Sequence, residues 1–273
     1  MTQKYISWFS CGAPSAVAAM LACREYGPEN VRIIRQDTGS EHEDNERFMA
    51  DFSRWTGQPV EVTKSTKFAN VDEVIEGCQW IAGVHGARCT GELKKIPAQD
   101  CIKFGKGQEI EVFGYTIEEK HRVDRWVKNN KERKIDPILI RYGLTKGDCK
   151  GILWKAGIKI PVMYELGYNN NNCIGCIKGQ AGYWNKIRKD FPEVFERRAK
   201  QERDIGAAIC KVESSSDDWP EWVKGLSNFG DQTISEETGR ARLPLYLDEL
   251  PLHYGKHKTE GPISCGLICM MNA

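Results

Sequence analysis

The stretch that decides the fold is YISWFSCGAPSAVAAM, residues 5–20. It begins with a run typical of a strand, Tyr5–Ser10, and passes through small residues into an alanine-rich run typical of a helix. A strand, a tight turn and a helix in this order are the first half of a βαβ unit. Gly12 and Pro14 interrupt the apolar run where an export signal is continuous, so we do not expect a secretory signal here.

Strand and helix patterns alternate through the first half of the chain. Further strand-like runs lie at Val31–Gln36, Pro59–Thr63, Glu109–Phe113 and Pro137–Ile140. Phe48, Phe52 and Trp55 share one face of a predicted helix over residues 43–56, and a charged helix is expected over residues 116–129. This alternation predicts an α/β fold with a doubly wound, Rossmann-like parallel sheet. Ligands of such sheets bind at the carboxyl ends of the strands.

The second half of the chain follows a different pattern. Helical patterns at residues 146–156 and 180–203, the latter restarting at Pro192, flank a loop that carries Cys173 and Cys176. Beyond the polar linker at residues 214–218 there is little periodicity. We therefore expect three segments: an α/β domain at 1–144, a helical, cysteine-bearing extension packed on it at 145–210, and an irregular tail with Cys265 and Cys269 at 211–273.

The composition excludes several classes of protein. With 40% hydrophobic and 28% charged residues, the chain can form a packed core. Its 39 basic and 38 acidic residues leave a net charge of +1, without an overall basic field for nucleic acid. No apolar stretch reaches the roughly 18 residues of a membrane helix. Eleven cysteines, an odd number, do not indicate a disulfide framework, so we expect thiols or metal ligands in a reducing cytoplasm.

Three predicted strands end in small or polar residues that can hold a nucleotide. Small residues let backbone N–H groups approach an anion, and the start of a helix adds partial positive charge. The candidate binding residues are Ser10, Cys11, Gly12, Ala13 and Ser15 in the first turn, Asp37, Thr38 and Gly39 after the second strand, and Gly114, Tyr115, Glu119 and Arg122 after the fourth. Each group also occurs as an ordinary turn, and together they favour a nucleotide site.

Cys173 and Cys176 form a Cys-x2-Cys pair on a loop rich in glycine and asparagine. This spacing lets two thiolates face one metal ion or cluster. Candidate partners elsewhere in the chain are Cys89, Cys101, Cys149, Cys265 and Cys269. Four such thiolates hold either zinc or a [4Fe–4S] cluster, and a redox-active or incidental cysteine pair is the remaining interpretation.

From about Tyr5 to Trp184, these segments resemble the adenylyl-sulfate and phosphoadenylyl-sulfate (PAPS) reductases of the PP-loop, or adenine-nucleotide α-hydrolase, superfamily. The motifs that carry the resemblance are the turn at residues 10–15, Asp-Thr-Gly at 37–39, residues 89–97, the ordered motifs at 157–176, and Cys-Gly-Leu at 265–267. The first turn lacks the Asp of the ATP-cleaving branch of the superfamily.

The resemblance implies that residues 1–144 bind an adenine nucleotide. Cys265 would attack the sulfate of adenylyl sulfate or PAPS as a thiolate, with Lys94 and Arg122 neutralising sulfate and phosphate oxygens. A thioredoxin-like dithiol would then release sulfite. A [4Fe–4S] cluster, or zinc in its place, would lie beside the nucleotide. The ligand set implied for it is Cys89, Cys173 and Cys176 with Cys149 as the fourth, and Cys269 or Cys265 as competitors for that place.

Two other functions fit the same residues. The first is a PP-loop sulfurtransferase that uses ATP to thiolate a nucleic acid and carries sulfur on Cys265 and Cys269 or on the cluster. The basic residues at 128–134 and 186–198 are candidate contacts for a nucleic-acid backbone, although such runs are more often solvated surface. The second is a non-catalytic nucleotide-binding protein with structural zinc.

Overall fold

The computed structural model describes residues 3–83, 86–101, 109–214, 219–234, 239–261 and 263. This part of the chain forms two compact units. Unit 1 comprises residues 3–71 and Cys89–Cys173, and unit 2 comprises Asp72–Arg88 and residues 174–263.

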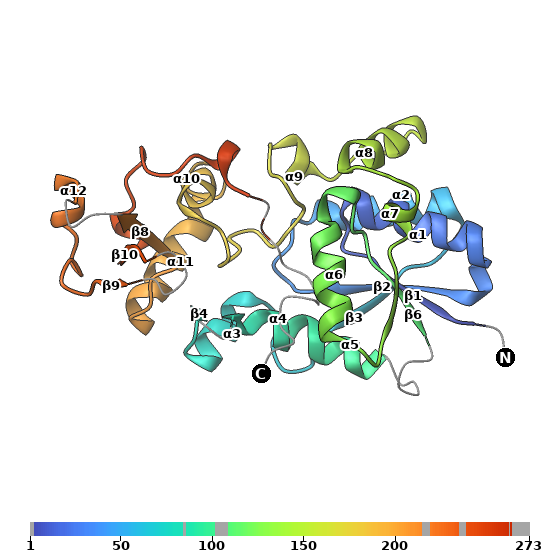
Figure 1. Cartoon of the computed structure of the whole chain (residues 1–273), viewed down its shortest axis with the longest axis horizontal. Helices are drawn as coiled ribbons and strands as arrows, with labels where there is room; N and C mark the ends of the chain where they lie inside the picture. Colours follow the sequence, from blue (N-terminus) through green and yellow to red (C-terminus); the bar gives the residue numbers. More distant parts are fainter. Residues whose placement is uncertain are drawn as a thin grey trace. The chain divides into compact units, whose positions relative to one another are not determined.

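Unit 1 is built on a five-stranded sheet in the order β3-β2-β1-β6-β7, with every neighbouring pair parallel (Figure 1). The strands are β1 (Tyr5–Trp8), β2 (Val31–Asp37), β3 (Glu61–Lys64), β6 (Ile110–Val112) and β7 (Lys134–Asp136). Tyr5 of the central strand β1 is in register with Val31 on one side and Ile110 on the other. This architecture confirms the predicted α/β, Rossmann-like fold.

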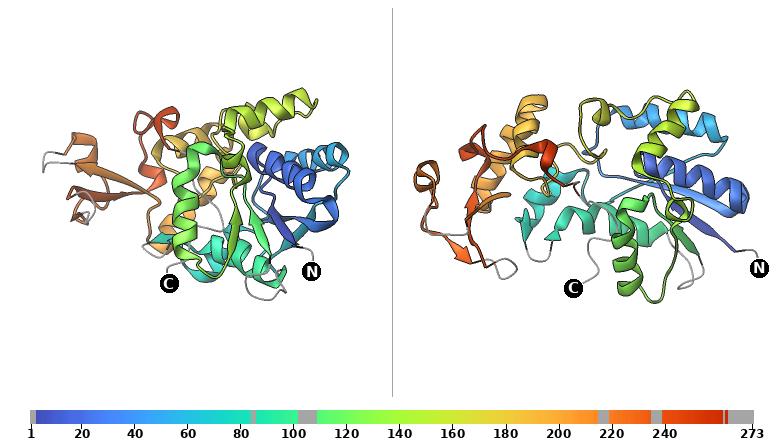
Figure 2. Two further views of the ribbon diagram at one scale, coloured as in Figure 1. Left: turned by 45° about the vertical axis from the view of Figure 1, so that its right-hand side comes forward. Right: turned by 45° about the horizontal axis from the view of Figure 1, so that its top comes forward.

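Helices flank the sheet of unit 1 on both faces (Figure 2). They are α1 (Ala13–Tyr26), η1 (Pro28–Asn30), α2 (Asp44–Thr56), α4 (Arg88–Thr90), the π-helix η2 (Gly91–Lys95), α5 (Ile96–Cys101), η3 (Ile117–Glu119), α6 (Lys120–Asn129), α7 (Ile138–Arg141), α8 (Lys146–Lys155) and α9 (Val162–Glu165). Successive residues of β2 point to opposite faces: Ile33 packs in the core with α1, and Ile34 packs in the core with Trp126 of α6. A strand buried on both faces is what a doubly wound sheet requires.

Two of the expected elements of unit 1 show how local sequence determines their limits. Helix α2 keeps Phe48 and Phe52 buried and ends before Gly57, whose φ of 67° terminates it, as the periodicity predicts. The prediction of a strand at residues 137–140 is wrong. Strand β7 ends at Asp136, and residues 138–141 form α7, because Pro137 cannot donate to a sheet ladder and instead precedes a helical turn.

Unit 2 combines helices with small antiparallel sheets. Its elements are α3 (Val71–Cys78), β4 (Ala82–Gly83), β5 (Gly86–Ala87), α10 (Ala181–Asp190), α11 (Pro192–Ile205), β8 (Cys210–Ser214), α12 (Glu221–Lys224), β9 (Thr233–Ile234), β10 (Ala241–Leu245), η4 (Leu247–Glu249) and η5 (His257–Thr259). The helical run expected at residues 180–203 is confirmed. It breaks at Phe191, which has φ −143° before Pro192, because a residue that precedes proline avoids helical geometry.

The tail expected to be irregular contains an antiparallel sheet in the order β8-β10-β9. Its strands are only two to five residues long, too short for a clear alternating pattern. Leu243 and Leu245 of β10 are nevertheless fully buried, which gives the sheet an apolar face. In the part of the chain that the structure describes, the helices all fall short of the length and apolar character needed to cross a membrane.

Candidate functional site

The turn between β1 and α1 is closed by the hydroxyl of Ser15. The Ser10 backbone N–H donates to Ser15 Oγ over 3.1 Å, and this Oγ donates to the Gly12 carbonyl over 2.9 Å. Cys11 has a φ of 53°, in the left-handed region that residues other than glycine seldom adopt. Of the predicted residues of this turn, Ser10 is exposed, and Cys11, Gly12, Ala13 and Ser15 are buried. Ser10 is therefore the one exposed residue among these five.

The start of α1 meets the phenol of Tyr164, a residue of α9. The phenol oxygen accepts hydrogen bonds from the backbone N–H groups of Ala13 and Asn171. Burial raises the pKa of Tyr164 to about 12, so the phenol is neutral at physiological pH. Lys150 Nζ of α8 lies 4.4 Å from the centre of the Tyr164 ring. An oxygen acceptor and a cation thus lie together at the positive end of α1.

The end of β6 packs closely against the same helix start. A Cβ atom on Gly114 would lie 2.5 Å from the backbone nitrogen of Ser15, so this position requires glycine. The ring of Tyr115 is buried, and the Arg122 guanidinium lies 4.5 Å from its centre. Arg122 also forms an ion pair with Glu119. The residues predicted after the fourth strand are therefore brought to the same edge of the sheet as the first turn.

Lys146, the first residue of α8, adds a third cation to this edge. Its Nζ donates to the Asn169 carbonyl over 2.9 Å and to Asn170 Oδ1 over 2.6 Å. Burial lowers the pKa of Lys146, and the neighbouring positive charges of Lys150 and Arg122 lower it further, against the opposing effect of Glu118 and Glu119. With Glu118 and Glu119 beside them, Arg122, Lys146 and Lys150 leave one net positive charge, which a bound anion would neutralise.

Lys146, Lys150 and Tyr164 are not among the site residues predicted from the sequence. Lys146 and Lys150 are four residues apart, a spacing that places two side chains on one side of a helix, and this was the available signal. Nothing in the sequence shows that this side of α8 lies near the start of α1.

These groups surround the topological switch point of the sheet. The chain passes from β1 to β2 on one side, and β6 later pairs with β1 on the other side. Open α/β sheets bind ligands at such a point, beyond the carboxyl ends of the two diverging strands. In this protein that position lies between the turn at residues 10–15 and the segment at 114–119.

The Asp-Thr-Gly segment at the end of β2 is held mainly by the protein itself. Asp37 Oδ1 accepts the Gly39 N–H over 2.9 Å, and Lys64 Nζ lies 2.8 Å from Asp37 Oδ2. Burial opposes the charge of Asp37, yet the hydrogen bonds from Lys64 and Gly39 hold its pKa below the usual value. Gly39 has a φ of 62°, and a Cβ there would lie 2.0 Å from the Ala69 carbonyl oxygen. Asp37 is therefore held by contacts within the protein, and these contacts determine the shape of the turn.

Thr38 and Lys94 complete the β2 side of the site. Thr38 is 1% exposed, and its Oγ1 lies 3.1 Å from Cys173 Sγ. Lys94 is half-buried on the π-helix η2. Burial raises the pKa of Glu41, and the positive charges of Lys94 and Arg35 counteract that rise, which places Lys94 near the residues that follow β2.

No disulfide joins the cysteines of the described residues. Among these residues, no group of three or more His, Cys, Asp or Glu side chains is arranged to hold a metal ion. Cys149 has no exposed surface and lies in the apolar core with residues of α1. Cys173 contacts Thr38, and the Cys176 N–H donates to the Tyr183 hydroxyl over 2.9 Å. Cys149 thus lies in the core of unit 1, and the ligand set of Cys89, Cys149, Cys173 and Cys176 stays a prediction.

Of the remaining cysteines in the predicted ligand set, Cys89 lies within the described residues. It is half-buried in α4. The predicted nucleophile Cys265 and the competing ligand Cys269 lie outside the described residues. The ligand set predicted from the sequence is thus without support in the described part of the chain.

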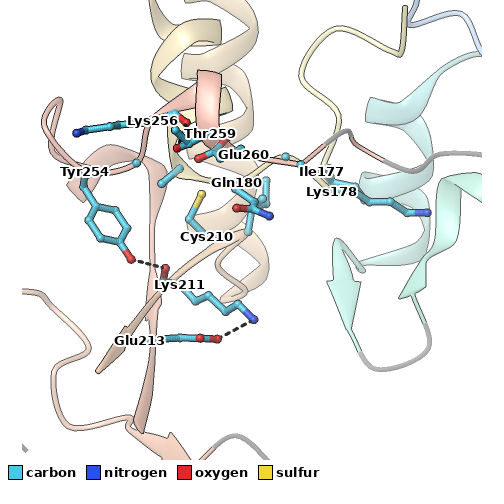
Figure 3. Close-up of a pocket in the computed structure, with 15 residues that line it drawn as sticks. Ile177, Lys178, Gln180, Cys210, Lys211, Glu213, Tyr254, Lys256, Thr259 and Glu260 are labelled. Carbon is cyan, nitrogen blue, oxygen red and sulfur yellow. Dashed lines mark hydrogen bonds and ion pairs between the residues drawn. The ribbon is translucent and has the colours of Figure 1, made fainter. Parts of the chain in front are cut away.

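Unit 2 contains a cavity of about 700 Å³ that none of the predicted site residues lines (Figure 3). Its walls come from the start of α10, from β8, and from residues 254–261. Lys211 Nζ and Glu213 Oε1 form an ion pair of 3.1 Å there, and the Cys210 thiol lies in the wall. Burial raises the pKa of the Cys210 thiol, so it is protonated at neutral pH and is a poor nucleophile.

No protein-family model and no curated protein matches the chain. Among solved structures, the chain is similar to the crystal structure of phosphoadenylyl-sulfate (PAPS) reductase from Candida auris in a phosphate complex. The two are 13% identical, the match covers 62% of this chain and 81% of the other, and the TM-score is 0.43.

Proposed function

We propose that the protein is a reductase that binds an adenylyl sulfate, with or without a 3′-phosphate, and transfers its sulfonate group to a thiol of the chain. The observation that carries this proposal is the gathering of Arg122, Lys146 and Lys150 at the switch point of the parallel sheet. These cations lie beside the start of α1, where an anionic ligand is stabilised by both charge and helix dipole.

The residues of unit 1 have distinct tasks in this proposal. Ser10 and the backbone of the first turn face the phosphate, and Lys150 and Arg122 neutralise it. Lys94, on the β2 side of the site, offers positive charge to the sulfate oxygens. Thr38 and Gly39 shape the wall against which the nucleoside packs. The proposal needs no ATP cleavage, which agrees with the absence of an Asp in the first turn.

The chemistry uses Cys265 as the nucleophile. Its thiolate attacks the sulfur of the sulfate, an S–S bond forms, and the bond from sulfur to the bridging phosphate oxygen breaks. The electron pair of that bond leaves with AMP, or with adenosine 3′,5′-bisphosphate when the substrate carries a 3′-phosphate. An external dithiol of the thioredoxin class then supplies two electrons, releasing sulfite and becoming a disulfide. A reducing cytoplasm keeps both thiols available.

Sulfite release tests the proposal directly. The wild-type protein is mixed with adenylyl sulfate or PAPS and a reduced dithiol protein, and sulfite and nucleotide products are quantified. We expect equal amounts of sulfite and nucleotide, no sulfite from Cys265→Ser, and unchanged release from Cys78→Ser, a half-buried thiol outside the proposed site. Equal rates for wild type and Cys265→Ser would remove Cys265 from the mechanism. Pyrophosphate release from ATP without sulfite production would favour the sulfurtransferase alternative.

A further inference from the structure

Tyr164 places a buried hydroxyl at the start of α1, where the proposed function locates the phosphate of the nucleotide. The phenol oxygen lies 3.2 Å from the position that a Cβ on Gly12 would take, so it contacts the first turn. Tyr164 is 9% exposed, and it belongs to unit 1 together with that turn. The hydroxyl is therefore a polar group held in place beside the proposed phosphate site.

Among the described residues, none accepts the hydrogen of the Tyr164 hydroxyl. A phenol oxygen accepts hydrogen bonds through its lone pairs and donates one through its hydrogen. The backbone N–H groups of Ala13 and Asn171 supply the bonds that the Tyr164 oxygen accepts. Its hydrogen remains available to a further partner. Because buried donors are nearly always paired in folded proteins, this hydrogen points to a ligand that offers an acceptor.

The surroundings of Tyr164 keep its hydroxyl protonated and strengthen it as a donor. Burial raises the pKa of the phenol to about 12, so the hydrogen stays on the oxygen at neutral pH. Lys150 Nζ lies 4.4 Å from the centre of the ring, and a cation in this place draws electron density away from the oxygen. The negative charge of Glu119, which is also close to the phenol, is balanced by the ion pair with Arg122. These groups together favour donation to an anion.

We propose that the Tyr164 hydroxyl donates a hydrogen bond to the phosphate of the bound nucleotide, and that this bond makes the site select phosphorylated adenosine over adenosine. The inference rests on the proposed function for the location of the phosphate. The N–H groups of Ala13 and Asn171 polarise the hydroxyl, so their partial positive charge reaches the phosphate through it. Loss of the hydroxyl therefore weakens only those ligands that carry a phosphate.

The first test compares AMP and adenosine 3′,5′-bisphosphate with adenosine, using calorimetry and, for weak binding, ligand-observed NMR on the full-length protein. Tyr164→Phe removes the hydroxyl and keeps the ring. We expect it to raise the dissociation constants of both nucleotides about tenfold, as for a hydrogen bond to a charged group, and to leave that of adenosine unchanged. Tyr142→Phe is the matched control and binds like the wild type, because the Tyr142 hydroxyl donates to Glu25 Oε2, over 3.1 Å, in the last turn of α1.

The second test keeps the phenol oxygen, because Tyr164→Phe also removes the acceptor of two backbone N–H groups. Site-specific incorporation gives Tyr164→3-fluorotyrosine, in which the fluorine makes the hydroxyl a stronger donor while burial keeps it protonated at neutral pH. We expect this variant to bind AMP about twofold more tightly than the wild type does, and adenosine with the same affinity. Tyr142→3-fluorotyrosine is the matched control and keeps both affinities.

The possible results separate this inference from the proposed function. If Tyr164→Phe binds the nucleotides like the wild type, or weakens nucleotides and adenosine by the same factor, the hydrogen bond to the phosphate is wrong and the reductase proposal stands. Failure of the wild type to bind either nucleotide would overturn both. If Tyr164→Phe does not fold, the fluorinated variant decides alone, and an AMP affinity equal to that of the wild type would overturn the inference.

Discussion

Lys150 is the residue through which the charge of the proposed site is most easily tested. Its Nζ lies 4.4 Å from the centre of the Tyr164 ring, and the oxygen of that ring accepts the N–H of Ala13 at the start of α1. The ammonium group is therefore held near the position where a phosphate would gain from the helix dipole. Lys155 lies on the same helix, is exposed, and provides a matched control.

We expect Lys150→Met to raise the dissociation constant for adenosine 3′,5′-bisphosphate about tenfold at low salt, an energy of about 1.4 kcal/mol. The difference from the wild type shrinks as salt is added, because ions screen the lost attraction. Lys155→Met keeps the wild-type affinity. Calorimetric titrations at two salt concentrations measure both effects. Equal weakening by the two variants would show that only the overall charge of the protein matters.

At the scale of elements, the site depends on the contact between the end of β6 and the start of α1. A Cβ on Gly114 would lie 2.5 Å from the nitrogen of Ser15 and 2.7 Å from its Cα, both of which are backbone atoms that cannot rotate away. Gly151, in the interior of α8, has nothing within 4 Å of the position a Cβ would take. Close backbone contact therefore requires glycine at position 114, whereas the space around position 151 accepts a larger side chain.

We expect Gly114→Ala to lower the free energy of unfolding by about 2 kcal/mol, since overpacking forces the backbone apart. The same substitution weakens nucleotide binding by separating the two strand ends at the switch point. Gly151→Ala, by contrast, raises the free energy of unfolding by roughly 0.5–1 kcal/mol, because alanine is the better helix former. Urea unfolding of the two variants measures the difference. A stable Gly114→Ala with normal binding would contradict this account of the contact.

At the scale of the whole molecule, stability should depend on pH through Glu202 of α11. This side chain is fully buried, and it accepts the backbone N–H groups of Ile209 and, over 2.6 Å, of Leu247. It thus links α11 to the start of β8 and to η4 within unit 2. Burial raises the pKa of Glu202 to about 7, from an ordinary value of 4.5.

The raised pKa of Glu202 determines whether the free energy of unfolding rises or falls with pH. Between about pH 4.5 and 7, the folded state holds a proton on Glu202 that the unfolded state has released, so stability falls as the pH rises through this window. The loss attributable to Glu202 is on the order of 3 kcal/mol between pH 4.5 and 8. We expect Glu202→Gln to flatten the pH dependence of urea unfolding. An equally steep profile in that variant would show that other groups cause it.

Features of the fold that are set by neighbouring residues can be predicted from the sequence. Features that are set by contacts between distant residues cannot. The alternation of strand and helix and the position of the turn between β1 and α1 follow from local patterns, and both are confirmed. The sequence predicts a strand at residues 137–140, but the strand lies at Lys134–Asp136. An apolar run after a proline is compatible with either a strand or a helix, and only its packing partners distinguish the two. The short strands β8 and β10 pair with each other across about 30 residues, and no local pattern reveals such pairing.

The sequence by itself determined that unit 1 is a parallel α/β sheet with small residues where β1 meets α1, since periodicity and turn chemistry act over a few residues. Only the tertiary structure decided which side chains meet at that edge. It brought Lys146, Lys150 and Tyr164 to the start of α1, joined Thr38 to Cys173, and enclosed Cys149 in the apolar core. Contacts of this kind join residues up to 160 positions apart, as between Cys11 and Asn171, and their geometry exists only once the helices have packed on the sheet.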